Sequence, residues 1–283
     1  LPNPVTNEEE YLNEIIKNYL KNILKTERDI LEAYQSNQGK EAMSIVSSFL
    51  ISFANRTASK GRLNLFTTNY DRLIEYVSDL LGIRIIDRFV GTLSPIYRSS
   101  RLGVDMHYNP PGIRGEPRYL EGVIRLSKLH GSIDWKFEHP NLKRYNIPFG
   151  ASDDYTGIPT DPGKTVMIYP NPAKDVETLE FPYADLFRDF SSSICQHNSV
   201  LVTYGYGFGD DHINRAIRDM LTIPSTHLVI ISFDDAGGRI PKFIESVAKD
   251  SQISLLLGNH FGDLKTIIEN YLPKPGLDHI SLE

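Results

Sequence analysis

The sequence is poor in cysteine, in long apolar runs and in clustered positive charge. Cys195 is the only cysteine among 283 residues, which excludes an internal disulfide and any cysteine-based zinc cluster. The 30 lysines and arginines are outnumbered by 36 aspartates and glutamates and form no stripe, which argues against direct nucleic-acid binding. No apolar run approaches the roughly 18 to 20 residues of a membrane span, and no signal peptide is recognisable. We therefore expect a cytoplasmic protein without a membrane anchor.

Glycine is also scarce at the start of the chain, where Gly39 is the only glycine in residues 1–60. Apolar residues recur there every three or four positions, which predicts amphipathic helices over residues 7–34 and 40–55. With 40% hydrophobic residues, the chain can bury a full core. The two helices carry no clear chemical group, so they either cover the rest of the fold or form a surface for self-association.

After residue 62, short apolar strands alternate with amphipathic helices. The expected strands are 63–66, 83–90, 123–129, 166–169, 200–203, 228–233 and 253–257, and the expected helices are 73–81, 183–197, 211–221, 240–248 and 264–272. This alternation predicts an α/β fold with a Rossmann-like, mostly parallel sheet and helices on both faces. The first two strands, 63–66 and 83–90, form a βαβ unit with the helix between them, so we expect them to be a parallel pair. Two long insertions rich in proline and glycine, residues 91–122 and 140–163, interrupt the pattern.

Ligands of an open parallel sheet bind at the carboxyl ends of its strands, so the polar turns there form the candidate site. Four turns qualify: residues 67–71, 130–132, 205–210 and 232–235. Each residue also has a structural alternative. Asp71 could cap the helix that follows, His130 could be a satisfied turn histidine, and Asp234 could be an ordinary turn residue. A GxGxG pattern such as the one after residue 204 gives backbone freedom but is a weak signal by itself.

Together these segments resemble the sirtuin-like superfamily. Residues 67–71 (TTNYD) match its Thr-x-Asn-x-Asp segment, Leu129-His130-Gly131 its catalytic Leu-His-Gly, and Gly205-Tyr206-Gly207 its later Gly-x-Ser/Gly turn. Residues 204–214 (YGYGFGDDHIN) look most like the bacterial sirtuin-like domains of anti-phage defence, which hydrolyse NAD. The resemblance implies an NAD hydrolase that depletes NAD in response to phage, controlled by a homo-oligomeric assembly or by a partner such as a HerA-like ATPase.

The resemblance further implies a single sirtuin-like domain over residues 1–283, with a helical segment (1–60) and a Rossmann-like NAD-binding core (62–272). NAD would be the substrate, and no metal would be needed.

Carried over to this sequence, the catalytic roles fall on Asn69, Asp71 and His130. Asn69 would bind the nicotinamide ribose and help place the attacking water, Asp71 would hold the carboxamide, and His130 would be the general base. The implied dinucleotide-binding residues are Thr67, Thr68, Gly131, Gly205, Gly207, Asp210 and Asp234. Of these, the two later glycines and Asp210 would meet the adenosine half, with Asp234 at the adenine ribose.

Two departures from the family pattern keep alternatives open. Sirtuin deacylases carry a zinc ribbon of four cysteines, which one cysteine cannot build, so plain hydrolysis is favoured over deacylation. The family's Gly-Ala-Gly phosphate loop has no match in residues 1–60, and we expect it to lie upstream of this sequence. The missing loop is the best argument for the alternative from another class, a scaffold module that binds NAD or ADP-ribose without turnover.

Overall fold

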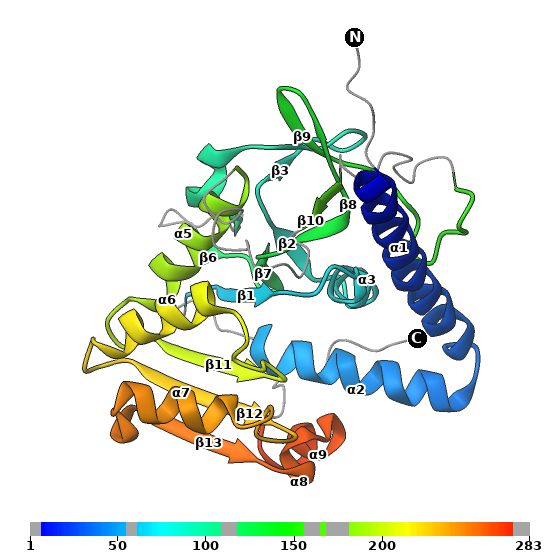
Figure 1. The fold of residues 1–283 in the computed structure, drawn as a ribbon. Coiled ribbons are helices and arrows are strands. Elements are labelled where there is room, and N and C mark those ends of the chain that lie inside the picture. Colours follow the sequence, from blue (N-terminus) through cyan, green and yellow to red (C-terminus); the bar gives the residue numbers. More distant parts are fainter. Residues whose placement is uncertain (1–6, 55–60, 109–117, 156–164, 168–180, 274–283) are drawn as a thin grey trace, which may run out of the picture. The chain divides into compact units, whose positions relative to one another are not determined.

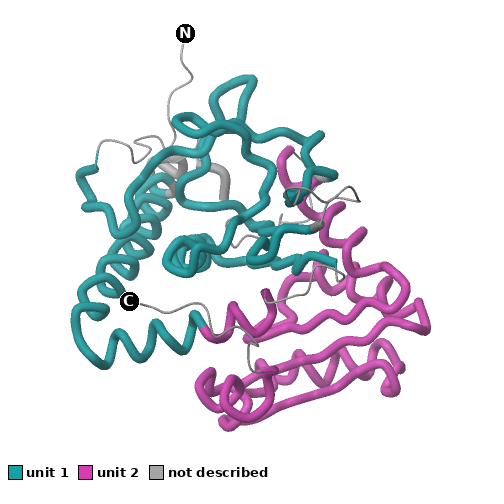
Figure 2. Tube along the Cα trace, turned by 180° about the vertical axis from the view of Figure 1, so that it is seen from behind, with its two compact units in different colours: residues 1–47, 56–169, 282 teal, residues 48–55, 170–281, 283 magenta. Residues whose placement is uncertain are grey.

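The computed structural model describes residues 7–54, 61–108, 118–155, 165–167 and 181–273 (Figure 1). The chain divides into two compact units, residues 1–47 with 56–169 and residues 48–55 with 170–281 (Figure 2). We call them the first and the second unit. The fold is α/β, as predicted, with parallel sheets flanked by helices and a helical N-terminal segment.

The first unit contains a parallel sheet with the strand order β1-β7-β2. Its strands are β1 (Leu63–Thr67), β7 (Val123–Lys128) and β2 (Arg84–Ile86). Helix α3 (Leu73–Leu80) connects β1 to β2. Its C-cap, Leu81, is followed by Gly82, whose φ of 64° is the left-handed conformation that glycine adopts without strain. Val123 and Ile124 of β7 are almost fully buried, as expected for the central strand of a parallel sheet.

Two expectations about this sheet were wrong. β1 and β2 do not pair with each other, because both pair with β7, which lies between them. The strand expected over residues 83–90 is also broken, since β2 stops at Ile86 and β3 (Phe89–Val90) joins another sheet. The cause is local: the Asp87 carboxylate accepts a 2.8 Å hydrogen bond from the Phe89 N–H, which turns the chain between the strands.

The two insertions contribute strands of their own. A five-stranded sheet has the order β10-β8-β9-β4-β3, and all of its pairings are antiparallel. Its remaining strands are β4 (Ile96–Tyr97), β8 (Gly131–Glu138), β9 (Asn141–Arg144) and β10 (Thr165–Met167). The first insertion also contains the 3-10 helix η1 (Ser99–Gly103) and a small hairpin of β5 (His107–Tyr108) and β6 (Arg118–Tyr119).

This sheet corrects two further expectations. The segment after His130, interpreted as a turn, continues directly into β8. The strand expected over 166–169 pairs antiparallel with β8 instead of extending the parallel sheet, and its last two residues lie outside the described part. Residues 109–117 and 156–163 of the expected insertions also lie outside it.

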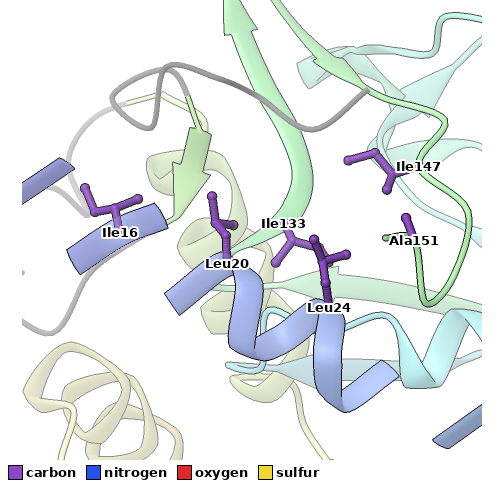
Figure 3. Close-up of a cluster of buried hydrophobic side chains, with 6 residues drawn as sticks. All are labelled: Ile16, Leu20, Leu24, Ile133, Ile147 and Ala151. Carbon is purple, nitrogen blue, oxygen red and sulfur yellow. The ribbon is translucent and has the colours of Figure 1, made fainter. Parts of the chain in front are cut away.

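Both N-terminal helices are present, α1 (Asn7–Ala33) and α2 (Asn37–Ala54). One face of α1 covers the first unit: its side chains at four-residue spacing form a buried cluster with residues from β8 and the segment after β9 (Figure 3). The cluster consists of Ile16, Leu20, Leu24, Ile133, Ile147 and Ala151. Within the described ranges, no helix is both long enough and apolar enough to cross a membrane.

The second unit is a parallel sheet in the order β11-β12-β13, with helices between its strands (Figure 1). The strands are β11 (Val200–Tyr204), β12 (His227–Ser232) and β13 (Ile253–Leu257). The helices are α5 (Tyr183–Ile194), α6 (Asp211–Leu221), α7 (Arg239–Val247), α8 (Asn259–Gly262) and α9 (Leu264–Asn270), and the 3-10 helix η3 (Asp250–Gln252) precedes β13. Leu228 and Ile230 of the central strand are fully buried.

Candidate active site

The turn between β1 and α3 (residues 67–71, the β1–α3 turn) lies beside the segment that follows β7. Thr67 is opposite Lys128 in the parallel register, and beyond the strands the Leu129 N–H donates to the Thr67 carbonyl over 2.8 Å. The ring centroids of Tyr70 and His130 are 6.4 Å apart. The first unit therefore brings the two segments with predicted catalytic residues to one sheet edge, where the carboxyl ends of parallel strands meet.

Asn69 is exposed in this turn, and Thr67 shapes it. The Asn69 N–H donates to the Thr67 side-chain oxygen over 3.1 Å, a local bond that competes with regular structure and stabilises a turn. Thr68, between them, is half-buried. An exposed amide offers both a donor and an acceptor to a ligand, which is what the predicted role of Asn69 requires.

Asp71 has a structural role just before the helix, although the N-cap residue of α3 is Arg72 and not Asp71. The Asp71 Oδ1 accepts a 3.0 Å hydrogen bond from the Leu73 N–H, two residues on, which is an Asx turn at the start of α3. A carboxylate has about four lone-pair positions on two oxygens, so this bond leaves acceptor capacity on Asp71. The turn bond and binding of a carboxamide are therefore compatible, and the turn bond restrains the orientation of the side chain.

His130 lies at the junction of β7 and β8 and is only 4% exposed. The residue after it, Gly131, has a φ of 85°, which lets the chain turn sharply from one strand into the next. The imidazole is buried, and its ring is near that of Tyr70. An imidazole next to the turn that contains Asn69 and Asp71 is a group that can perform general-base chemistry.

Tyr19 of α1 reaches the same turn, which the sequence did not reveal. Its ring meets Tyr70 edge-on with centroids 5.7 Å apart, and 38% of the side chain is exposed. Burial, and then the negative charge of Asp71, raise the pKa of Tyr19, so its hydroxyl stays protonated and can donate a hydrogen bond.

A buried ion pair between Glu27 of α1 and Arg72 holds the end of the turn. Glu27 is fully buried and Arg72 is 7% exposed, with Nη2 to Oε2 at 2.5 Å and Nε to Oε1 at 3.1 Å. Arg72 also donates to the carbonyls of Ile147 and Pro148. Helix α1 therefore contributes a buried structural charge to the turn, in addition to its apolar packing. One signal existed: Glu27 lies at helical spacing on the buried stripe of α1, three residues after Leu24.

Lys128 is a second buried cation at the turn. It is 2% exposed, and its ammonium donates to the Asp71 carbonyl, to the Tyr70 carbonyl over 3.3 Å and to Glu75 Oε1 over 3.1 Å. Sequence reasoning missed this residue too, because lysines are almost always exposed and nothing in the sequence marks the exception.

The second unit contains the other predicted residues, in two loops that follow neighbouring parallel strands. The β11–α6 loop (residues 205–210) begins at Gly205, whose φ is 65°. The Gly207 carbonyl accepts a 2.7 Å bond from Arg239 Nε. Tyr206 donates its hydroxyl to Asn214 Oδ1 over 2.9 Å, and burial raises its pKa. Asp210 precedes α6 without capping it through its side chain.

The β12–α7 loop (residues 233–238) contains Asp234, which is exposed. Its Oδ1 accepts a 2.9 Å hydrogen bond from the Ala236 N–H, and the next carboxylate, Asp235, accepts from the Gly237 N–H over 3.0 Å. The turn interpretation of Asp234 therefore holds for one of its oxygens. The side chain can still accept from a ribose hydroxyl with its remaining lone pairs.

The chain matches a known protein family. Residues 63–256 match the model of a family described as a SIR2-like domain, which is more than half of the 283-residue chain. The matched range begins at the first residue of β1 and ends inside β13, so it includes the predicted residues of both units. No curated protein matches the chain.

Proposed function

Because the chain belongs to the SIR2-like domain family, whose domains use NAD, we propose that it hydrolyses NAD to nicotinamide and ADP-ribose. The supporting observation is the packing of the β1–α3 turn beside His130 at one sheet edge. An amide, a carboxylate and an imidazole, from segments about sixty residues apart in the sequence, would then act together in the first unit.

In this proposal the bond between ribose C1′ and the pyridinium nitrogen breaks, and its electron pair leaves with nicotinamide. Water forms the new bond to C1′ and gives its proton to His130. Asn69 binds the ribose region and orients the water, while the remaining lone pairs of Asp71 accept from the carboxamide. Positioning supplies much of the rate, since the leaving group carries positive charge before it departs.

The adenosine half is assigned to the second unit, at Gly205, Gly207, Asp210 and Asp234. What favours these residues is their place after neighbouring parallel strands, where nucleotides bind in α/β folds. Left-handed glycine without a Cβ lets a ligand approach the backbone closely, and acidic side chains accept from ribose hydroxyls. Thr67, Thr68 and Gly131 complete the binding set in the first unit.

The proposed biological role is NAD depletion in anti-phage defence by a cytoplasmic assembly, with residues 1–283 as one sirtuin-like domain. The proposal includes a homo-oligomer or a HerA-like ATPase as partner.

Helix α1 supports self-association, because Tyr11, Ile15 and Tyr19 recur every four residues and are 38–68% exposed. Size-exclusion chromatography with light scattering tests the oligomer: a Tyr11→Glu and Ile15→Glu double variant should be smaller than the wild type, and equal sizes would contradict this surface.

The test of the activity is release of nicotinamide from NAD by the purified protein, with and without its partner. The wild type should release nicotinamide and ADP-ribose in equal amounts. His130→Ala and Asn69→Ala should abolish release without lowering the thermal midpoint by more than a few degrees, whereas His107→Ala, which changes an exposed histidine of β5, should keep it. Full activity of the His130 variant would disprove the assignment.

The same assay separates the alternatives. A scaffold module would bind NAD in calorimetry and release no nicotinamide. A deacylase would consume NAD only with an acyl-lysine peptide present, which the single cysteine disfavours, because the zinc ribbon of sirtuin deacylases needs four.

A further inference from the structure

We propose that Lys128 is a positioning residue of this site, whose ammonium fixes the backbone of the β1–α3 turn so that Asn69 and Asp71 keep their place beside His130. The inference rests on the proposed NAD hydrolysis and adds a residue outside the predicted motifs. Lys128 would not touch the substrate. It would act through the main chain of the two residues that follow Asn69.

The contacts of Lys128 are concentrated on the turn. Its ammonium donates to the Tyr70 and Asp71 carbonyls, and its side chain is 3% exposed. Its third partner, Glu75 in the first turn of α3, has a side chain that is 27% exposed. Two of the three printed partners of the ammonium are thus main-chain carbonyls of the turn.

The turn is tied to both sides of His130. Lys128, two residues before His130, is the last residue of β7. Ser132, two residues after His130, donates its hydroxyl to the Tyr70 carbonyl over 3.3 Å, and the Ile133 N–H donates to the same oxygen over 3.3 Å. The Tyr70 carbonyl thus accepts hydrogen bonds from residues on both sides of His130 in the sequence. These bonds hold the turn and the segment that contains the histidine in a fixed relative position.

Stability alone does not call for a lysine here. Taking an ammonium out of water costs several kcal/mol, and hydrophobic replacements of buried ion pairs are often neutral or stabilising. The main-chain carbonyls of an irregular turn, however, need donors from outside a regular helix or strand ladder, and a buried carbonyl without a donor is costly. A cation with several donors satisfies two such carbonyls from one point and thereby fixes their relative position.

The chain offers a matched control at the opposite end of β1. Arg62 is a partly buried cation, with a side chain that is 10% exposed, and it binds an acid, Asp105, at 2.9 Å and donates to two backbone carbonyls, those of Met106 and Leu120. None of these groups belongs to the β1–α3 turn. Arg62→Met and Lys128→Met therefore remove the same kind of interaction from the same unit, but only Lys128→Met releases the turn.

The experiment measures steady-state NAD hydrolysis and thermal midpoints for the wild type and for Lys128→Met, Lys128→Arg, Ser132→Ala and Arg62→Met. Lys128→Met should lower kcat roughly 100-fold, the order of loss expected for a misplacement of about 1 Å, with KM changed less than about threefold. Lys128→Arg should recover at least part of kcat. Arg62→Met should lose thermal stability to a similar degree and keep kcat within about threefold of the wild type.

Ser132→Ala tests the positioning of the turn if Lys128→Met does not fold, because it removes a hydroxyl that donates to the same Tyr70 carbonyl as Lys128. It should lower kcat severalfold with little change in the thermal midpoint. Wild-type kcat in Ser132→Ala or Lys128→Met, or an equal loss in Arg62→Met, would overturn the role of Lys128 and leave the hydrolase intact. A wild-type protein that releases no nicotinamide would instead overturn the proposed function, and this inference with it.

Discussion

The carboxyl ends of the two parallel sheets are built in opposite ways. In the first unit, buried charged side chains hold the β1–α3 turn: Arg72 is paired with Glu27, and Lys128 holds main-chain carbonyls. In the second unit, the loop after β12 is largely exposed and the loop after β11 is partly buried, and both contain residues with left-handed backbone. These are Gly205, Phe208, Ala236, Gly237 and Gly238.

The difference fits a division of labour between chemistry and binding. Side chains that take part in bond cleavage must be held within a fraction of an ångström, and buried hydrogen-bonded charges provide that rigidity. A dinucleotide needs close approach to the backbone, which glycine and a left-handed conformation allow. We therefore expect substitutions in the first unit to act on stability and kcat, and those in the second to act on affinity.

The largest expected difference is in the free energy of unfolding, between substitutions of two arginines that each donate hydrogen bonds to main-chain carbonyls of a loop. Arg72 is 7% exposed and pairs with the fully buried Glu27, so Arg72→Met leaves a buried carboxylate without its cation and should cost about 3–5 kcal/mol. Arg239 is exposed and binds the Gly207 carbonyl at 2.7 Å, so Arg239→Met should cost about 0.5 kcal/mol. Chemical denaturation of both variants measures the difference.

A double variant refines this test. Adding Glu27→Met to Arg72→Met removes the orphaned carboxylate and should restore part of the lost stability, because the uncompensated charge is the main penalty. Equal unfolding free energies for the Arg72 and Arg239 variants would end the contrast between the two units.

Much of the fold could be predicted because it follows local periodicity. Helix α6 and strand β13 have the predicted limits, since each has one clear apolar pattern and defined ends. Strand β8 was missed because its first five residues are all buried, including Ser132 and Asp134, so it shows neither alternation nor a purely apolar run. Its pairing with β9 and β10 is set by tertiary contacts that no local pattern encodes.

Some residues of the candidate site could likewise be predicted from the sequence, and others could not. The turn and His130 could be found because short polar residues after apolar strands mark a sheet edge, and Asp71 could be recognised as a residue that bonds to the start of the following helix. Lys128 could not be found, since a lysine in a sequence is expected in solvent and its burial depends on how the turn folds over it. Glu27 was recognisable only from its position on the apolar stripe of α1.

A smaller effect should separate two glycines of the second unit. Gly205 and Gly237 both have a φ of 65°, and a Cβ added to either would meet nothing within 4 Å beyond its chain neighbours, so alanine should cost about 1 kcal/mol from backbone strain alone. Only Gly205 is assigned to the adenosine half of NAD. Gly205→Ala should therefore raise KM severalfold with kcat unchanged, while Gly237→Ala should alter neither constant. Equal KM values in the two variants would remove Gly205 from the binding set.

The smallest effect concerns two acids whose pKa values are lowered by different means. In the first unit, hydrogen bonds from Lys143 and then Tyr145 lower the pKa of Glu138 from 4.5 to about 2. In the second, hydrogen bonds from Thr266 lower the pKa of Asp263, which caps α9.

Each lowered pKa stabilises the fold above the ordinary value, 4.5 for Glu138 and 3.8 for Asp263, and this contribution is lost as the pH falls through the folded value. Thermal midpoints measured between pH 6 and pH 2 should therefore fall less steeply for Glu138→Gln and Asp263→Asn than for the wild type. Adding about 0.5 M salt should shrink the effect of Glu138→Gln, because a charged lysine partner is screened, and should leave that of Asp263→Asn nearly unchanged. The same salt response in both variants would mean that charge pairing does not distinguish the first unit from the second.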